Sequence, residues 1–373
     1  MKFRKLMIAA AVALTATAHA DDLVVGTVNP MSGVLADLSN DLVSGVKACF
    51  EAINAKGGVN GNRIQLVARD GGYKPGDAAN VVKQVIEQEK PIAMIAIAGT
   101  SINEAILEQK LLTSHQIPLI GPLSGGAALR KPINPYLYNL RASYKVEAQR
   151  LVKQALSSGA TKVAVFYQND DFGQDGLAAA EAAMVKAGHK LAASGGYETG
   201  SDDVKAAVAA ILKSQPDAVV MFSANKSTAA FIKAMRAAGS TAQFYNVSTV
   251  NHKALIQLAG LNNVQNMVIS QVVPSPNNTV KSVVREYREN LKKYVPTAQP
   301  SHNGLESYIA AKVLVEGLKH AGNSPTRSSL QRALDGLGRY NAGGFEVTFG
   351  PSDREGSDLV ELGIVGPDGE LRQ

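Results

Sequence analysis

The sequence predicts an α/β protein of two Rossmann-like lobes, each with a parallel-sheet core, joined by a three-segment hinge. Short apolar runs rich in β-branched residues alternate with amphipathic stretches, as in parallel strands connected by helices. At 373 residues, the chain exceeds the roughly 250–300 residues at which a single core usually stops growing. Only 5% of the residues are aromatic and none is Trp, so Ala, Val, Leu and Ile must form the cores.

Six apolar runs are expected to be buried parallel strands, with a helix after most of them. The expected strands are Leu23–Val28, Ile64–Ala68, Ala93–Ala98, Pro118–Ile120, Lys162–Tyr167 and Ala218–Phe222. The expected helices are Asp41–Ala55, Pro75–Glu89, Val146–Ser158, Gly173–Ala187, Asp202–Lys213 and Lys226–Ala238. Glycines close several of these helices, as at Lys56-Gly57-Gly58.

Three segments that break the alternation are predicted to cross between the lobes: Asn134–Tyr144, Val268–Pro276 and Tyr340–Phe345. Lobe 1 then comprises residues 21–141 plus 273–344, and lobe 2 comprises residues 142–272 plus 345–373. A few extended residues at each crossing can absorb the rotation of rigid lobes, which predicts a hinge.

The first twenty residues have the pattern of a cleaved signal peptide. Basic residues at the start precede an apolar run, Leu6–Leu14, and small residues end in Ala18-His19-Ala20. The run is far shorter than the roughly 20 residues that span a bilayer, and no cysteine follows it to carry a lipid. We therefore expect residues 1–20 to be removed and the remaining chain to reside in the periplasm.

Composition argues against several classes of function. The formal charge of +6 falls to +3 without the three basic residues of the signal, and no basic cluster suggests nucleic-acid binding. The single cysteine, Cys49, lies at helical spacing among apolar residues and is expected to be buried. The histidines have no metal-binding spacing, and there is neither a nucleophile elbow nor a phosphate-binding loop. We expect no catalytic residues, no metal and no cofactor.

Small polar residues follow three of the expected strands at predicted helix starts. Ser32 follows the first strand, Thr100 and Ser101 follow the third, and Ser124 and Gly125 follow the fourth. Helix N-termini at the carboxyl ends of parallel strands offer unpaired N–H groups to an anion. Each loop alone is equally explained by helix capping, but three such loops on one sheet edge favour a binding site.

The chain resembles the type I periplasmic solute-binding proteins of ABC importers, within the leucine/branched-chain amino-acid-binding (Leu/Ile/Val-binding) family. The resemblance covers essentially the whole mature chain. It rests on four linked blocks: Gly26–Gly33 (GTVNPMSG), Ala52–Asn62 (AINAKGGVNGN), Ile117–Leu129 (IPLIGPLSGGAAL) and Phe172-Gly173.

The resemblance implies a ligand site between the lobes. In relatives that bind amino acids, two of these strand-end loops hold the ligand's carboxylate. The resemblance implies the same role for Thr100, Ser101, Ser124 and Gly125. Phe172 stands where relatives place an aromatic ring against the ligand, although a core ring is an equal alternative. Asn225 either binds ligand or caps the next helix. At the first crossing, Tyr144 is expected to reach the ligand, whereas Arg141 is expected to serve structure.

Ser248 departs from the family pattern. It aligns with an acidic residue that pairs with the ligand's ammonium group in amino-acid-binding relatives. An ammonium group buried without a counter-charge is strongly penalised, so an α-amino acid would need another acid, such as Asp170 or Asp171. Organic acids, including aromatic ones, and amides therefore remain candidate ligands. Leu38 stands where some relatives carry an aromatic ring.

The leading hypothesis is a monomeric receptor that closes over one small molecule and delivers it to an ABC permease. Ligand would act only through its differential affinity for the open and closed forms. The alternative is a sensing subunit that passes the closed state to a separate signalling chain. An enzyme is the least favoured hypothesis, because the sequence has no metal-binding histidine spacing, no nucleophile elbow and no phosphate-binding loop.

Overall fold

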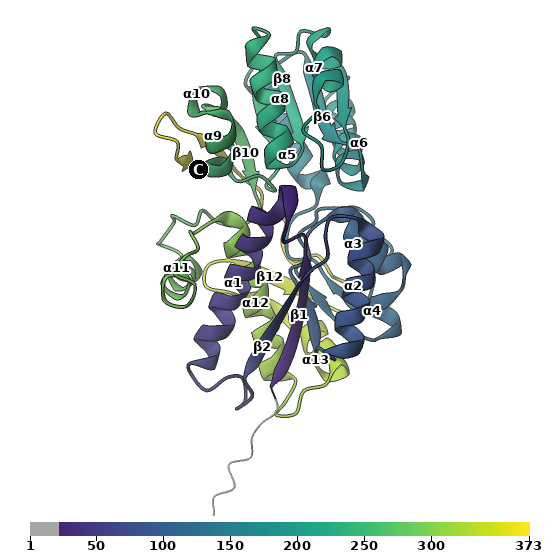
Figure 1. Ribbon diagram of the computed structural model, residues 1–373, viewed down its shortest axis with the longest axis vertical. Helices are drawn as coiled ribbons and strands as arrows, with labels where there is room; N and C mark the ends of the chain where they lie inside the picture. The colour runs from purple at the N-terminus through teal and green to yellow at the C-terminus, as the bar shows by residue number, and fades with distance from the viewer. Residues whose placement is uncertain (1–21) are drawn as a thin grey trace, which may run out of the picture.

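The computed structural model describes residues 22–373 and shows two α/β lobes, one above the other in Figure 1, joined through a narrow waist. The predicted signal peptide therefore lies outside the described residues. Lobe 1 contains a parallel sheet in the order β2-β1-β3-β4-β5. Its strands are β1 (Leu23–Asn29), β2 (Ile64–Asp70), β3 (Ala93–Ile95), β4 (Leu119–Ile120) and β5 (Leu137–Tyr138).

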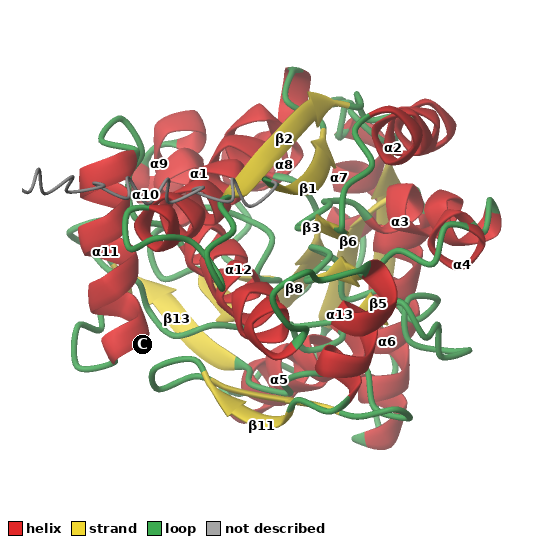
Figure 2. Cartoon of the chain, turned by 90° about the horizontal axis from the view of Figure 1, so that it is seen from below, coloured by secondary structure: helices red, strands yellow, loops and turns green. Residues whose placement is uncertain are grey.

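Helices cover both faces of the lobe-1 sheet (Figure 2). One face carries α1 (Ala36–Asn54), α11 (Ser282–Tyr294), α12 (His302–His320) and α13 (Arg327–Asp335). The other carries α2 (Pro75–Gln88), α3 (Thr100–Glu108) and α4 (Leu111–Ser114). Gly45 of α1 lies directly against the backbone of Gly304 in α12, leaving no room for a Cβ atom. This contact lets the two longest helices pack closely.

Lobe 2 is built on a larger, mixed sheet in the order β14-β13-β10-β9-β8-β6-β7. Five strands are parallel: β6 (Val163–Gln168), β7 (Ala193–Tyr197), β8 (Ala218–Phe222), β9 (Gln243–Asn246) and β10 (Val268–Gln271). The two C-terminal strands, β13 (Glu361–Val365) and β14 (Leu371–Arg372), are antiparallel. The helices are α5 (Tyr144–Ser157), α6 (Asp171–Lys186), α7 (Lys205–Leu212), α8 (Asn225–Ala237), α9 (His252–Ala259) and α10 (Leu261–Val264).

The chain passes between the lobes after β5, after β10 and before β13. The third crossing was predicted at Tyr340–Phe345, and this is wrong. These residues form the turn of a hairpin of β11 (Gly338–Asn341) and β12 (Glu346–Phe349). The Asn341 side chain accepts the backbone N–H groups of Gly343 and Gly344, both at positive φ. The glycine pair therefore marks a tight hairpin.

Hairpin residues placed in lobe 2 by the sequence analysis belong to lobe 1. Phe345, Val347 and Phe349 are buried in the same core cluster as Val25 of β1. Glu355 forms a bridge to Asn139, which keeps the chain on lobe 1 until shortly before β13. Lobe 1 therefore extends about ten residues beyond the predicted boundary at residue 344. Within residues 22–373, no helix is long and apolar enough to cross a membrane.

Candidate functional site

The carboxyl ends of strands from both lobes border a cleft of ≈ 730 Å³. Lobe 1 contributes Ser32, the loop between β2 and α2, and the start of α3. Lobe 2 contributes the loops after β6 and β7. Ligand pockets in proteins are typically about 300–1,000 Å³. The cleft is therefore large enough for a small organic molecule.

A second, smaller cavity of ≈ 40 Å³ adjoins the cleft, and the two share Tyr73, Gly99 and Thr100 in their walls. Its lining is mainly apolar and comes from both lobes: Leu35, Leu38, Leu123, Tyr144, Phe172, Ala224, Asn225 and Thr249 complete it. It contains no acidic side chain. A ligand that fills it would place an apolar group there and its polar end toward the cleft.

The N-terminus of α3 lies where the two cavities meet. Gly99 precedes the helix with φ of 100° and offers no side chain to cap it. The first N–H groups of a helix have no partner within it, and they carry the positive end of the dipole. The Ser101 hydroxyl oxygen is buried and has no hydrogen-bond partner. This helix end therefore presents several unused donors to a negatively charged group.

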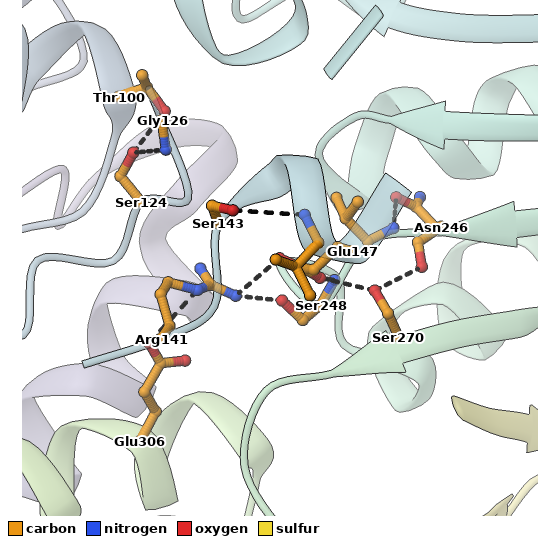
Figure 3. Close-up of polar contacts among 12 residues, drawn as sticks. Thr100, Ser124, Gly126, Arg141, Ser143, Glu147, Asn246, Ser248, Ser270 and Glu306 are labelled. Atoms are coloured by element: carbon orange, nitrogen blue, oxygen red, sulfur yellow. Dashed lines mark hydrogen bonds and ion pairs between the residues drawn. The ribbon is translucent and has the colours of Figure 1, made fainter. Parts of the chain in front are cut away.

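Ser124 is hydrogen-bonded to this helix end through Thr100, the first residue of α3. Its hydroxyl lies 2.8 Å from the Thr100 hydroxyl and accepts the Gly126 N–H at 3.0 Å (Figure 3). Ser124 is fully buried and lines neither cavity. The loop Ser124–Gly126 was expected to open a helix, but it continues into a turn instead. Ser124 thus holds the hydroxyl of Thr100, a residue that lines both cavities.

Gly125 shapes the site through its lack of a side chain. A Cβ atom there would lie 2.5 Å from the Tyr144 ring and 2.6 Å from its backbone nitrogen. The Gly125 carbonyl accepts the Tyr144 N–H at 2.9 Å. The Tyr144 ring in turn contacts the Phe172 ring, with centroids 5.1 Å apart. Phe172 belongs to the lobe-2 core and also lines the inner cavity.

Asn225 also lines the inner cavity, at the N-terminus of α8. Its side-chain oxygen accepts the backbone N–H of Asn251 at 2.9 Å, so part of the amide is committed to the fold. Capping of α8, one of the two roles considered for Asn225, is not observed, because Ala224 precedes the helix and no side chain caps it. Asn225 and Thr249 both line the inner cavity.

Ser248 lies apart from both cavities, in a buried ionic cluster at the hinge (Figure 3). The Arg141 guanidinium donates to the Ser248 hydroxyl. It also lies 3.8 Å from a Glu147 carboxylate oxygen in lobe 2 and 3.5 Å from one of Glu306 in lobe 1. Glu147 accepts further bonds from the Ser248 N–H at 2.9 Å and the Ser270 hydroxyl at 2.6 Å. Arg141 thus has the structural role expected for it.

Burial determines the charges of this cluster. The cluster contains one guanidinium and two carboxyl groups, all essentially inaccessible to solvent. Burial raises the pKa of Glu306 to about 7, although the nearby Arg141 charge opposes the rise. Protonation of Glu306 would lessen the negative charge that faces Arg141.

Of the nine candidate site residues, six line the two cavities: Ser32, Thr100, Ser101, Tyr144, Phe172 and Asn225. Ser124 and Gly125 lie directly behind them, and Ser248 belongs to the hinge cluster. Further lining residues were not predicted from the sequence, among them Tyr73, Leu35, Leu123 and Thr249. Tyr73 was detectable, since it follows β2 just before a helix that begins with Pro75.

The described part of the chain contains no group of three or more His, Cys, Asp or Glu side chains arranged to hold a metal ion. Cys49 is buried, and burial raises the pKa of its thiol to about 12. The thiol is therefore protonated and unreactive at neutral pH.

A family model described as periplasmic binding protein matches residues 22–366, nearly all of the described chain. The chain belongs to the periplasmic binding protein family. An amino acid binding protein of Pseudomonas aeruginosa is 26% identical over 336 residues, which cover 88% of this chain and 87% of that protein. A Leu/Ile/Val-binding protein homolog of Brucella melitensis is 24% identical, and the alignment covers 98% of this chain and 94% of that protein.

Solved structures confirm the predicted family and fold. A substrate-binding periplasmic protein from Ralstonia solanacearum superposes with a TM-score of 0.90 at 30% identity, covering 94% of this chain and all of that one. A leucine binding protein from Thermotoga maritima gives a TM-score of 0.83 at 18% identity, covering 94% and 99%. The relatives and solved structures named here are binding proteins rather than enzymes. Membership of the family implies a periplasmic location.

Proposed function

We propose that this protein is the substrate-binding component of an ABC-type importer and that it closes its two lobes over a small carboxylate-bearing solute. The observation that carries the proposal is the N-terminus of α3, where Thr100 and Ser101 face a cleft lined by both lobes. Charge-assisted hydrogen bonds of this kind contribute roughly 1.5–3 kcal/mol each. The protein acts as a monomer, and its partner is a membrane permease.

The lining of the cavities also bears on the ligand class. The apolar inner cavity suits a hydrocarbon or aromatic group attached to the carboxylate. Ser248 lies outside the cleft and binds Arg141. The acidic residues that line the outer cleft are Asp170 and Asp171. An α-amino acid would have to place its ammonium group there.

The names of relatives are compatible with a shared carboxylate. They include amino acid and Leu/Ile/Val-binding proteins, and a fatty acid ABC transporter substrate-binding protein from Thermomonospora curvata. All three ligand classes contain a carboxylate, and only two contain an ammonium group. The carboxylate is therefore the part of the ligand that we assign, and organic acids without an amine fit the described lining best.

A matched panel tests this function. Thermal unfolding and calorimetry would be measured with 4-methylpentanoate, its amide, L-leucine and 3-phenylpropanoate. We expect at least one carboxylate to raise the melting temperature and the amide to have little effect. Thr100→Val should lower the affinity for the carboxylate about tenfold. Thr113→Val, an exposed threonine on α4, is the control. Equal binding of acid and amide, or unchanged binding by Thr100→Val, would refute the carboxylate assignment.

A further inference from the structure

A hydrogen bond between two side chains joins the two lobes where the cavities meet. Tyr73 lies on the lobe-1 loop between β2 and α2 and lines both cavities. Gln168 is the last residue of β6 in lobe 2. The Gln168 amide nitrogen donates to the Tyr73 hydroxyl over 2.8 Å. This bond therefore exists only while the lobes are close together.

Gln168 is held rigidly by its own lobe. It is 1% exposed, and its amide nitrogen also donates to Asp170 at 2.6 Å. Its amide oxygen accepts the Tyr197 hydroxyl at 2.9 Å, and the Tyr197 oxygen accepts the Ala224 N–H at 3.1 Å. A carboxylate only accepts, so the amide nitrogen must face Asp170. The network thus ties Gln168 to residues at the ends of β7 and β8 and presents an ordered donor to lobe 1.

The direction of the bond leaves the Tyr73 proton available. Because Tyr73 accepts from Gln168, its own O–H points to a different acceptor. Tyr73 lines both cavities, as Thr100 does. A phenol that donates to an anion becomes a stronger acceptor, because hydrogen bonds in a chain polarise one another. An anion bound by Tyr73 would therefore strengthen the bond to Gln168.

We propose that the Tyr73–Gln168 hydrogen bond is the latch that holds the lobes closed, and that Tyr73 couples it to the ligand by donating its proton to the carboxylate. The coupling rests on the proposed function, whereas the latch does not. At the waist, where the chain crosses between the lobes, the Tyr144 N–H donates to the Gly125 carbonyl and Arg141 donates to Ser248. Away from the waist, two further hydrogen bonds in the described part of the chain join the lobes. They run from Ala127 to Asp175 at 2.7 Å and from Asn251 to Asp41 at 3.5 Å. The residues of these two bonds line neither cavity, so a ligand bound there would not contact them directly.

The latch is tested in the ligand-free protein by electron–electron resonance distances between spin labels at Gln84→Cys and Glu181→Cys. Both positions are exposed, one in each lobe, while native Cys49 is 2% exposed. We expect Tyr73→Phe to shift the population from the closed toward the open distance. Tyr136→Phe is the control, because Tyr136 packs against the same core cluster as Tyr73. Identical distance distributions for Tyr73→Phe and wild type would overturn the latch.

A double-mutant cycle shows whether both residues act through one bond. Gln168→Leu alone, and combined with Tyr73→Phe, should open the lobes no more than Tyr73→Phe alone. Additive opening would overturn the assignment to a shared bond. If Gln168→Leu fails to fold, the Tyr73→Phe and Tyr136→Phe pair still decides the latch.

The coupling is tested with 4-methylpentanoate and 4-methylpentanamide at matched ionic strength. We expect the acid, and not the amide, to increase the closed population in wild type, and about tenfold more acid to be needed with Tyr73→Phe. An equal response in both proteins, or no response in wild type, would overturn the coupling. If the acid binds by calorimetry without this difference, the proposed function stands and only the coupling fails.

Discussion

Replacing Arg141 by methionine should destabilise the protein strongly, because it leaves buried carboxyl groups without their counter-charge. The Arg141 side chain is 0% exposed, as is that of Glu147, and that of Glu306 is 4% exposed. Breaking a buried ion pair by removing one partner typically costs about 3–5 kcal/mol. Methionine retains much of the apolar length of the side chain, so most of this cost is electrostatic.

The assay is equilibrium urea unfolding of Arg141→Met, followed by circular dichroism at neutral pH. Arg339→Met is the matched control, because Arg339 is 73% exposed and its ion pair with Glu346 should contribute about 0–1 kcal/mol. The reasoning would be refuted if Arg141→Met lowered the free energy of unfolding no more than Arg339→Met does. It would show that solvent or another cation compensates the buried carboxyl groups.

Three further outcomes follow from the same packing. The raised pKa of Glu306, about 7, means that its contribution to stability is complete below the unfolded value near 4.5 and is lost as pH rises through about 7. In Glu306→Gln, the free energy of unfolding should therefore vary less between these pH values. Gly176→Ala should cost about 1–3 kcal/mol in thermal or urea unfolding, since the added Cβ overlaps the Phe222 ring. Gly125→Ala should weaken ligand binding in calorimetry, because the methyl group displaces the Tyr144 ring.

The alternation of strands and helices was predictable because each element carries its own periodic pattern. The strand at Ala218–Phe222 was predicted with its observed bounds, and the helix at Pro75 begins where proline indicates. Strand β7 (Ala193–Tyr197) was missed, because two glycines interrupt its apolar pattern. Gly195 is required there, since a Cβ atom would contact the backbone of Ala207 in α7.

The candidate site was predictable only where it consists of strand-end loops. Thr100 and Ser101 were found because parallel strands place their carboxyl ends at one sheet edge. The hinge cluster could not be predicted from the sequence. Its residues Arg141, Glu147 and Glu306 come from separate parts of the chain and meet only through tertiary packing. Nothing in the local sequence indicates that Ser248 accepts from an arginine there instead of facing the cleft.

Native mass spectrometry of the protein purified from its own periplasm tests the central claim most directly. We expect a population that carries one small molecule per chain, released on denaturation and identifiable as a carboxylic acid. The same preparation of Thr100→Val should contain markedly less of it. A bound compound without a carboxylate, or the same acid retained at full occupancy by Thr100→Val, would contradict the account.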